Sequence, residues 1–233
     1  MGNTIKNRVI GIDVGVKHTT IAVVDQRGNI LGTDSFPTTD YPDVNNFLTI
    51  LSERIVVLAE ANGGFENIRS VGMSAPSSNY LTGCIENAGN IPWKGVIPLA
   101  AMLRDRIGLA VALGNDAHIT ALGEHVYGAA HGMQNFIFVS FGHGGLGSCM
   151  FSNGLPHLGA NGSAGEMGHS CMVDGGRQCT CGRKGCLEAY VVDRGMVQTA
   201  EELMAETDEP SLMRALETLT PQAIALCCEQ GTT

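Results

Sequence analysis

The sequence predicts an α/β protein, and three observations support this class. Segments of five or six mostly apolar residues, short enough for strands, alternate along the chain with longer segments that carry helix signals. Glycine is abundant, with 31 residues among 233, as expected of a fold with many tight turns. Hydrophobic residues make up 44% of the chain, enough for the core of one large or two modest domains and unlike a disordered or fibrous protein.

The first strands predict an antiparallel meander. Residues 9–14, 19–24 and 30–34 are short, mainly apolar segments, separated by glycine-containing turns. Asp13 and Gly15 stand at the first turn, where backbone amides can approach a phosphate and an acid can orient a metal-bound nucleotide. An ordinary hairpin turn explains the same Asp-x-Gly pattern, so that both interpretations stay open here.

A helix, a strand and a polar loop are expected next. The helix spans residues 44–61, with Asp43 as its N-cap and Asn62-Gly63-Gly64 at its end. Residues 68–73 predict a buried strand. The loop at 74–80 then leaves the sheet at a strand end, where ligands commonly bind in folds of this class.

The following segment contains the only tryptophan and an acid at a strand-to-helix junction. Trp93 suits either a site wall, through its amphipathic ring, or the core. Residues 98–105 predict a short helix and 109–113 a strand, after which Asp116 opens a helix that runs to about Tyr127. Helix capping is the local explanation of an acid at this point. The alternative is a general base, because an acid at the carboxyl edge of the sheet can take the proton from a hydroxyl that attacks a phosphoryl group.

The second half begins with a glycine-rich hairpin and ends in helices. Residues 136–140 and 148–152 predict two strands, and the turn at 141–147 is a second candidate for cradling phosphate. Most of the tail at 192–228 is expected to be helical, with Pro210 and Pro221 at helix starts. One phosphate-binding turn is therefore predicted in each half.

The most specific motif is a set of four soft metal ligands. One histidine and three cysteines follow the spacing H-x9-C-x-C-x4-C, and they are His169, Cys179, Cys181 and Cys186. This set suits tetrahedral zinc, and four protein ligands leave no open position, so a structural site is expected. The alternatives are small apolar core residues and disulfide partners in an exported protein. Cys171 is a spare thiol, expected to pack beside the site or to compete as a ligand.

Two carboxylates flank this motif. Glu166 precedes His169 by three residues, and Glu188 follows the last cysteine by two. A metal-braced loop would hold both acids rigidly, together with the second ring nitrogen of His169. Acceptors fixed in this way suit a polyhydroxylated ligand such as a sugar. Each sugar hydroxyl needs a hydrogen-bond partner when it is buried, and a hydroxyl or an acceptor left without one costs free energy, which makes binding selective. A solvated surface position is the alternative for each acid.

Charge and composition bear on partners and location. The formal net charge is −9 and no basic run offsets it, which argues against nucleic acid and anionic membranes as partners. The first residues lack the apolar segment and cleavage site of a signal peptide, and no apolar run is long enough to span a bilayer. A cytoplasmic location is therefore expected.

Five motifs together carry a family resemblance. They are GIDVGVKHTTIAVVD at 11–25, Asn90-Ile91-Pro92-Trp93-Lys94-Gly95, GNDAHITALGE at 114–124, GANGSAGEMGHSCMV at 159–173 and CTCGRKGCLEAY at 179–190. In these motifs the chain resembles the ROK family (repressor, open reading frame, kinase), especially its bacterial glucokinases. The resemblance implies an actin-like ATPase (ribonuclease-H-like) fold with a structural zinc loop. Its two α/β domains are expected at 1–113 and 114–233.

The resemblance also implies roles for individual residues. Asp116 looks like the catalytic base that deprotonates a sugar 6-hydroxyl. The residues that look like sugar ligands are Asn90, Asn115, Glu166, His169 and Glu188. His169 is counted among the zinc ligands as well, with Cys179, Cys181 and Cys186. The phosphate path would include Asp13, Gly15, Gly145 and Gly147, with Mg²⁺ accompanying ATP, and a homodimer or homotetramer is implied.

The chain departs from the family pattern at both phosphate turns. Val16 and Lys17 replace the Gly-Thr of the first turn, where the ammonium group of Lys17 would supply charge to phosphate instead. The Gly-Thr-Gly of the second turn is His143-Gly144-Gly145, and His118 stands where the family has Asn after Asp-Ala. The resemblance also ends before the family's adenine-side glycine-rich segment and final helix, so the second domain is expected to be truncated.

The expected activity is ATP-dependent phosphorylation of glucose or a close relative at the 6-hydroxyl. The alternative is a catalytically impaired or truncated sugar-binding protein of the same family, without productive ATP binding. The family's repressor branch requires an N-terminal helix-turn-helix, and here the first strand is expected within ten residues of the start, which disfavours it.

Overall fold

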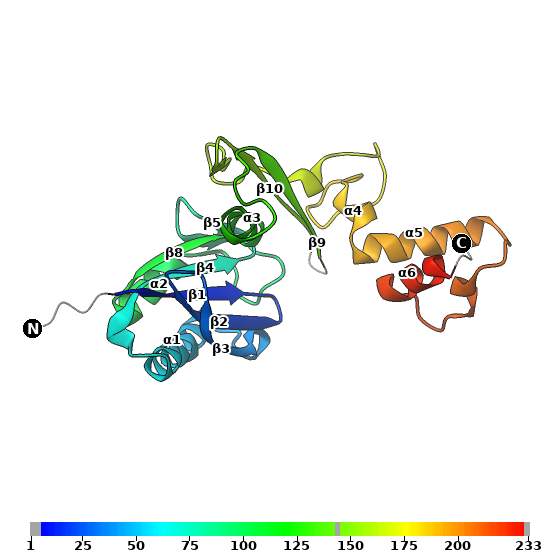
Figure 1. Cartoon of the computed structure of the whole chain (residues 1–233). Helices are drawn as coiled ribbons and strands as arrows, with labels where there is room; N and C mark the ends of the chain where they lie inside the picture. Colours follow the sequence, from blue (N-terminus) through cyan, green and yellow to red (C-terminus); the bar gives the residue numbers. More distant parts are fainter. Residues whose placement is uncertain (1–5, 143–144, 231–233) are drawn as a thin grey trace, which may run out of the picture. The chain divides into compact units, whose positions relative to one another are not determined.

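The computed structural model describes residues 6–142 and 145–230, which form two compact units (Figure 1). Unit 1 contains the chain up to Phe136 together with Phe151–Ala164, and unit 2 contains Ile137–Met150 together with the chain from Gly165 onward. This division differs from the domains expected at 1–113 and 114–233. The reason is that α3 (Asp116–Tyr127) packs against the main sheet of unit 1.

Strands and helices are both numerous, as the predicted α/β class requires. The strands are β1 (Arg8–Val14), β2 (His18–Asp25), β3 (Ile30–Pro37), β4 (Ile68–Ala75), β5 (Ser78–Asn79), β6 (Cys84–Glu86), β7 (Val96–Ile97), β8 (Ala110–Asn115), β9 (Phe136–Gly142), β10 (Gly145–Ser152) and β11 (Leu155–Pro156). The other helices are α1 (Val44–Ala61), α2 (Leu99–Ile107), α4 (Glu188–Val191), α5 (Asp193–Glu206) and α6 (Pro221–Glu229). Single 3₁₀ turns are η1 (Thr38–Asp40), η2 (Phe65–Asn67), η3 (Met167–His169) and η4 (Leu212–Ala215). Within the described chain, no helix is both long and apolar enough to cross a membrane.

The main sheet of unit 1 has the strand order β3-β2-β1-β4-β8. The first three strands form the predicted antiparallel meander, whereas β1, β4 and β8 run parallel to one another. Parallel strands end at the same edge of a sheet. Asp13 of β1 accordingly lies opposite Ser74 of β4, and Ala75 lies opposite Asn115 of β8. This edge positions three of the predicted site residues, Asp13, Asn115 and Asp116.

Helices α1 and α2 cover one face of this sheet, and α1 shows how the sequence specifies them. Asp43 is its N-cap, as predicted, and accepts hydrogen bonds from the amides of Asn45 and Asn46 at 3.0 and 2.9 Å. The buried side chains recur at helical spacing and are Phe47, Leu48, Leu51, Ile55, Leu58 and Ala59. The helix therefore forms because its apolar stripe and its cap agree.

Trp93 belongs to the core of unit 1. Its ring centroid lies 4.4 Å from that of Phe47, and its Nε1 donates a hydrogen bond to the carbonyl oxygen of Tyr41 at 3.0 Å. Only 3% of the residue is exposed. A buried indole with a satisfied N–H fits the core alternative and not the wall of a binding site.

The other face of the main sheet carries small side chains. Four of them lie side by side in register across four strands, and they are Ala22, Gly11, Gly72 and Ala112. A Cβ added at either glycine would meet no atom of the described chain within 4 Å. Beside this row lies an apolar cavity of about 740 Å³, lined in part by Leu122 and Val126 of α3.

The segment Phe151–Ala164 returns the chain to unit 1 through specific contacts. The rings of Phe136 and Phe151 stack at 4.4 Å between centroids. The side-chain amide of Asn79 donates to the carbonyl oxygen of Asn161 at 2.9 Å. The first contact joins the two strands of the predicted hairpin. The second joins residues 82 positions apart, so the local sequence pattern gave no sign of it.

Unit 2 contains most of β9 and β10, the metal motif and the C-terminal helices. Pro221 occupies the first turn of α6, as predicted, and Thr220 is the N-cap of this helix. The prediction that Pro210 starts a helix is wrong. The residue after it, Ser211, is extended and caps only the single turn η4, which is held by hydrogen bonds from the Arg214 guanidinium to the carbonyl oxygens of Met204 and Thr207.

Candidate functional site

The metal motif of unit 2 folds as a tight loop whose bends are made by glycine. Gly182 and Gly185 have φ angles of 87° and 78°, which L side chains rarely adopt. A Cβ on Gly185 would also lie 1.7 Å from the carbonyl oxygen of Val173. Isolated bridges pair Gln178 with Lys184 and Cys171 with Cys186, so that the loop doubles back on itself.

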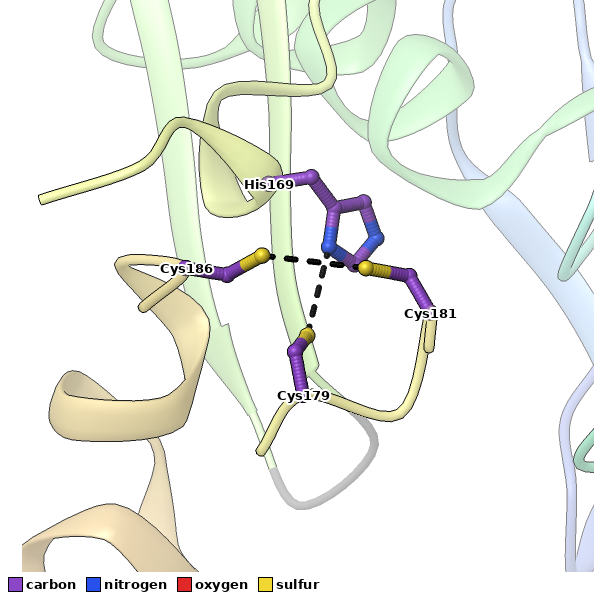
Figure 2. A group of neighbouring side chains, drawn as sticks. All are labelled: His169, Cys179, Cys181 and Cys186. Carbon is purple, nitrogen blue, oxygen red and sulfur yellow. Dashed lines mark hydrogen bonds between the residues drawn. The ribbon is translucent and has the colours of Figure 1, made fainter. Parts of the chain in front are cut away.

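This folding brings the four predicted metal ligands together (Figure 2). They are His169, Cys179, Cys181 and Cys186, and their ligand atoms all lie within 4.8 Å of one another. The imidazole presents Nδ1 to the Cys179 sulfur at 3.6 Å, and the sulfurs of Cys181 and Cys186 are 3.7 Å apart. Nδ1 is therefore the nitrogen that faces the Cys179 sulfur, and Nε2 is the other ring nitrogen.

The spacing of these atoms fits tetrahedral zinc. Zinc–sulfur bonds of about 2.3 Å and zinc–nitrogen bonds of about 2.0 Å place tetrahedral sulfur pairs about 3.8 Å apart and sulfur–nitrogen pairs about 3.5 Å apart. The two separations in the loop, 3.7 and 3.6 Å, match these values. Four protein ligands fill a tetrahedral site, so the group suits a structural metal and not one that activates water.

Arg183 sets the electrostatics of this loop. Hydrogen bonds from its backbone amide and then from its guanidinium lower the pKa of the Cys181 thiol to about 6. Burial raises the pKa of the Cys186 thiol to about 11. The Arg183 guanidinium also donates to the carbonyl oxygen of His169 at 3.0 Å, which fastens the histidine to the loop. One thiolate is thus favoured by the protein itself, whereas the buried thiol would ionise on binding a metal.

The other cysteines do not join this group. All eight lie in the described chain and each is free, so the disulfide alternative does not apply to this structure. Cys171 is exposed, and its sulfur lies 3.9 Å from the carbonyl oxygen of Lys184. Cys171 therefore lies beside the loop, which agrees with the expectation that it packs there and not with the expectation that it competes as a ligand.

The two flanking acids differ in their surroundings. Glu166 is exposed at the N-cap of η3, so the surface alternative describes its position. Glu188 is only 6% exposed and begins the short helix α4. Its carboxylate accepts hydrogen bonds from the Thr180 hydroxyl at 3.1 Å, the Arg194 guanidinium at 2.9 Å and the Leu146 amide at 3.2 Å. The surface alternative therefore does not apply to Glu188.

In unit 1, the first predicted phosphate turn lies at the edge where the parallel strands end. Ser74 of β4 donates a hydrogen bond to the Asp13 carboxylate at 2.7 Å, which fixes the direction of this exposed acid. The turn itself closes through the Gly15 amide, which donates to the carbonyl oxygen of His18 at 3.0 Å. Thr38 of η1 stabilises this turn with two hydrogen bonds. The Thr38 hydroxyl donates to the carbonyl oxygen of Gly15, and the Thr38 amide donates to the carbonyl oxygen of Lys17. Lys17 is exposed at this turn.

The same edge carries Asn115 and Asp116, and the structure separates their roles. Asn115 is the N-cap of α3 and accepts hydrogen bonds from the amides of Ala117 and His118 at 3.0 and 3.4 Å. Asp116 is the first helical residue, is exposed, and accepts one hydrogen bond from the next amide at 2.8 Å. The capping explanation proposed for Asp116 is therefore wrong, because Asn115 performs the capping.

The remaining predicted residues are placed as follows. Asn90 is exposed in the loop between β6 and β7. Gly145 and Gly147 lie at the start of β10, whereas His143 and Gly144 of the same turn lie outside the described residues. His118, a departure from the family pattern, is buried and donates from Nε2 to the carbonyl oxygen of Ala164 at 3.1 Å.

Two groups of predicted residues are thus assembled, one in each unit. In unit 1, Asp13, Asn115 and Asp116 share one sheet edge. In unit 2, Glu188 lies against the metal loop and against the start of β10. Sequence reasoning missed Ser74, Thr180 and Arg194. Thr180 had a signal, since it stands between two predicted metal ligands, whereas the other two reach their acids only through the fold.

The family comparison agrees with this architecture. The ROK family model matches residues 9–233, and the chain belongs to the ROK family. A glucokinase of Streptomyces coelicolor is 34% identical over 217 residues, which cover 92% of this chain and 66% of the glucokinase. A xylose repressor of Caldicellulosiruptor bescii is 26% identical over 227 residues, which cover 96% of this chain and 56% of the repressor. The chain therefore spans less than two thirds of the length of these curated relatives.

Solved structures similar to this chain also come from the ROK family. A ROK family glucokinase from Streptomyces griseus, in complex with glucose and AMPPNP, superposes with a TM-score of 0.70 at 30% identity, covering 86% of this chain and 62% of that one. A ROK family transcriptional regulator, a homologue of the E. coli MLC protein, reaches a TM-score of 0.82 at 22% identity, covering 100% of this chain and 58% of that one. The second likeness shows the fold alone. Relatives of the chain thus include both kinases and repressors. The repressor branch is the one that the sequence analysis disfavoured.

Proposed function

We propose that the protein is a sugar kinase that phosphorylates glucose or a close relative at its 6-hydroxyl, with ATP as phosphoryl donor. The observation that carries this proposal is the exposed Asp116 at the carboxyl edge of the parallel strands, relieved of helix capping by Asn115. Membership of a family with glucokinase relatives at 34% identity supports the substrate class.

In this proposal Asp116 is the general base. Its carboxylate accepts the proton of the sugar 6-hydroxyl as that oxygen attacks the terminal phosphorus of ATP, and ADP leaves. The proposed sugar ligands are Asn90, Asn115, Glu166, His169 and Glu188. For Asn115, capping occupies the side-chain oxygen and leaves the amide as a donor. The Glu188 carboxylate accepts from Thr180, Arg194 and Leu146, and the Cys179 thiol lies 4.0 Å from Oε1. A zinc-bound Cys179 thiolate would not donate to the carboxylate, which would leave capacity for a hydroxyl.

The phosphate contacts are proposed at the two turns. The residues are Asp13, Gly15 and Lys17 of the first turn and Gly145 and Gly147 of the second. Asp13 would orient the Mg²⁺ that accompanies ATP, and the direction of its carboxylate is fixed by Ser74. Lys17 would supply the positive charge to phosphate, in place of the hydroxyl that the family pattern carries there.

The metal of the loop is proposed to be structural zinc. The four donor atoms fit it in number, chemistry and spacing, and the ion would crosslink the loop that carries His169 and precedes Glu188. With Nδ1 on the metal, His169 would donate from Nε2 to a sugar hydroxyl. A cytoplasmic location and a homo-oligomer, dimer or tetramer, complete the proposal.

A panel of hexoses and N-acetylhexosamines tests this function. The purified 233-residue chain is incubated with ATP, Mg²⁺ and each sugar, phosphorylated product is measured, and zinc is determined on the same sample. Turnover of one sugar with one zinc per chain is the expected result. Zinc present, with no turnover of any sugar, would refute the kinase assignment.

A second candidate is sugar binding without catalysis. Two observations favour it: the xylose repressors among the relatives, and the changes at Val16 and Lys17 in the first phosphate turn. Calorimetry separates the two functions. Sugar binding with no heat on addition of nucleotide supports the binding protein, whereas nucleotide binding at micromolar concentration supports the kinase.

A further inference from the structure

The buried carboxylate of Glu188 joins three segments of unit 2 that are apart in sequence. Thr180 comes from the metal loop, Leu146 from the start of β10, and Arg194 from α5. Each donates one hydrogen bond to this carboxylate, at 3.1, 3.2 and 2.9 Å respectively. The metal loop, the strand and the helix therefore converge on the carboxylate of Glu188.

The two oxygens of Glu188 divide these contacts. Oε1 receives the hydroxyl of Thr180 and the guanidinium of Arg194, and the sulfur of Cys179 lies 4.0 Å from it, whereas Oε2 receives the backbone amide of Leu146. Oε2 also occupies the space beside Gly145, because a Cβ on that glycine would lie 2.7 Å from it. The carboxylate thus contacts Gly145 and Leu146 at the start of β10 with Oε2, and the metal loop with Oε1.

Because Glu188 is buried, the loss of any one of these hydrogen bonds would be costly in free energy. With 6% of the residue exposed, water cannot replace a lost donor at little cost, and a buried charge without partners is strongly disfavoured. Donors to an ionised carboxylate form stronger hydrogen bonds than neutral pairs. A displacement of one donor is therefore expected to move the carboxylate and its other contacts with it.

Thr180 stands between two metal ligands, Cys179 and Cys181, so the position of its hydroxyl follows the state of the loop. We propose that Glu188 is a positioning residue that transmits the state of the metal loop, through Thr180, to Gly145 and the Leu146 amide at the start of β10. The metal would then set the position of these two residues without touching them. The consequence for phosphate binding at Gly145 and Gly147 rests on the function proposed above.

The direct test removes the Thr180 hydroxyl and observes the Leu146 amide in zinc-loaded protein. Thr180→Val keeps the shape of the side chain and leaves the metal ligands intact. Hydrogen exchange at Leu146, measured by nuclear magnetic resonance, should become about tenfold faster than in the unchanged protein. Thr199→Val is the matched control, because the Thr199 hydroxyl donates within α5, to the carbonyl oxygen of Gly195.

A second variant separates transmission from general loosening. Glu188→Gln should also accelerate exchange at Leu146, and the double variant should be no faster than Glu188→Gln alone, because Thr180 acts through Glu188. Unchanged exchange at Leu146 in Thr180→Val would overturn the proposal. So would equal acceleration in Thr199→Val, or additive effects in the double variant.

Nucleotide binding gives a separate readout. In Thr180→Val the Kd for an ATP analogue should rise several-fold, and the Kd for sugar should rise with it because Glu188 is also a proposed sugar ligand. Thr199→Val should change neither value, whereas a general loss of structure would change both. If the unchanged protein binds no nucleotide, the proposed kinase function fails. The exchange rate at Leu146 then still decides whether Glu188 couples the loop to the hairpin.

Discussion

Asp116 and Asn115 are adjacent at the end of β8 but have different tasks. Asn115 caps α3, and Asp116 keeps an exposed carboxylate. We expect Asp116→Asn to lower kcat by about 10²- to 10⁴-fold, since a general base contributes about that much, with little change in thermal stability. Initial rates at saturating sugar check this. Asp105→Asn is the control, because Asp105 is exposed and pairs with its neighbour Arg104; activity retained in Asp116→Asn would remove the proposed base.

The metal loop allows a comparison between two exposed cysteines. Cys181→Ser removes a proposed ligand, whereas Cys171→Ser removes the thiol that lies outside the ligand group. We expect the first variant to lose most of its zinc after dialysis and the second to keep one zinc per chain. Elemental analysis of both proteins provides the measurement. Equal zinc contents would contradict the assigned ligand set.

At this scale, the sequence identified residues whose partners are close in the chain. The four proposed metal ligands lie within a span of eighteen residues, and their spacing in the sequence was sufficient to predict that their side chains lie together. The partners of Asp13 and Glu188 are different. Ser74 and Leu146 reach these acids from distant segments, and only the fold brings them together.

Among the elements, α3 depends on its N-cap, which makes Asn115 testable in two ways. Asn115→Ala should lower the free energy of unfolding by about 1 kcal/mol, the usual cost of a lost N-cap. Asn115→Ser should keep the cap and most of the stability, while removing the amide proposed to bind sugar. Thermal denaturation and sugar titration of both variants are the measurements. A normal sugar affinity in Asn115→Ser would leave Asn115 with its capping role alone.

Trp93 anchors the core between α1 and the loop that contains Asn90. Trp93→Phe removes the donor to the Tyr41 carbonyl and part of the contact with Phe47. We expect a loss of about 1–3 kcal/mol in the free energy of unfolding, from an unsatisfied acceptor and a packing defect. Urea denaturation measures this. The affinity for sugar should stay within twofold, and a much larger change would restore Trp93 as a candidate for the site wall.

The long elements were predictable and the shortest were not. Helix α1 and the strands of the meander have apolar patterns that identify them, and α1 begins and ends as expected. Strands β5, β6 and β7 have only two or three residues each and no pattern of their own. They exist because they pair with one another, which a local sequence pattern does not encode.

For the whole molecule, the proposed zinc should stabilise the two units unequally. All four ligands belong to unit 2, so removing the metal is expected to destabilise that unit by about 4 kcal/mol or more, the value for a ligand at a thousand times its Kd. Hydrogen exchange before and after chelation measures both units in one sample. Amides of β1 and β4 should keep their protection. Equal loss in both units would contradict a local structural role of the metal.

The division into units is the feature least accessible from sequence. A boundary at residue 113 follows the order of predicted elements, but α3 packs on the sheet before it. The segment Phe151–Ala164 then returns to unit 1 through ring contacts and hydrogen bonds with residues up to 82 positions away. A single cut in a linear sequence cannot represent units that each contain two separate segments.

This interleaving has a consequence for how the protein is made. A ribosome that has released Phe136 has not yet supplied Phe151–Ala164, so unit 1 must wait for that segment before its last contacts form. At about 5–20 residues per second the delay is on the order of a few seconds, in which the side chains of α3 and β5 that contact this segment, such as His118, His125 and Asn79, are uncovered. Unit 2 is completed later still, because its strands are synthesised well before Met167 and Glu188, which hydrogen-bond to β10. The order of synthesis therefore makes the nascent chain most vulnerable to misassociation in its middle, between the hairpin of β9 and β10 and the arrival of Cys186.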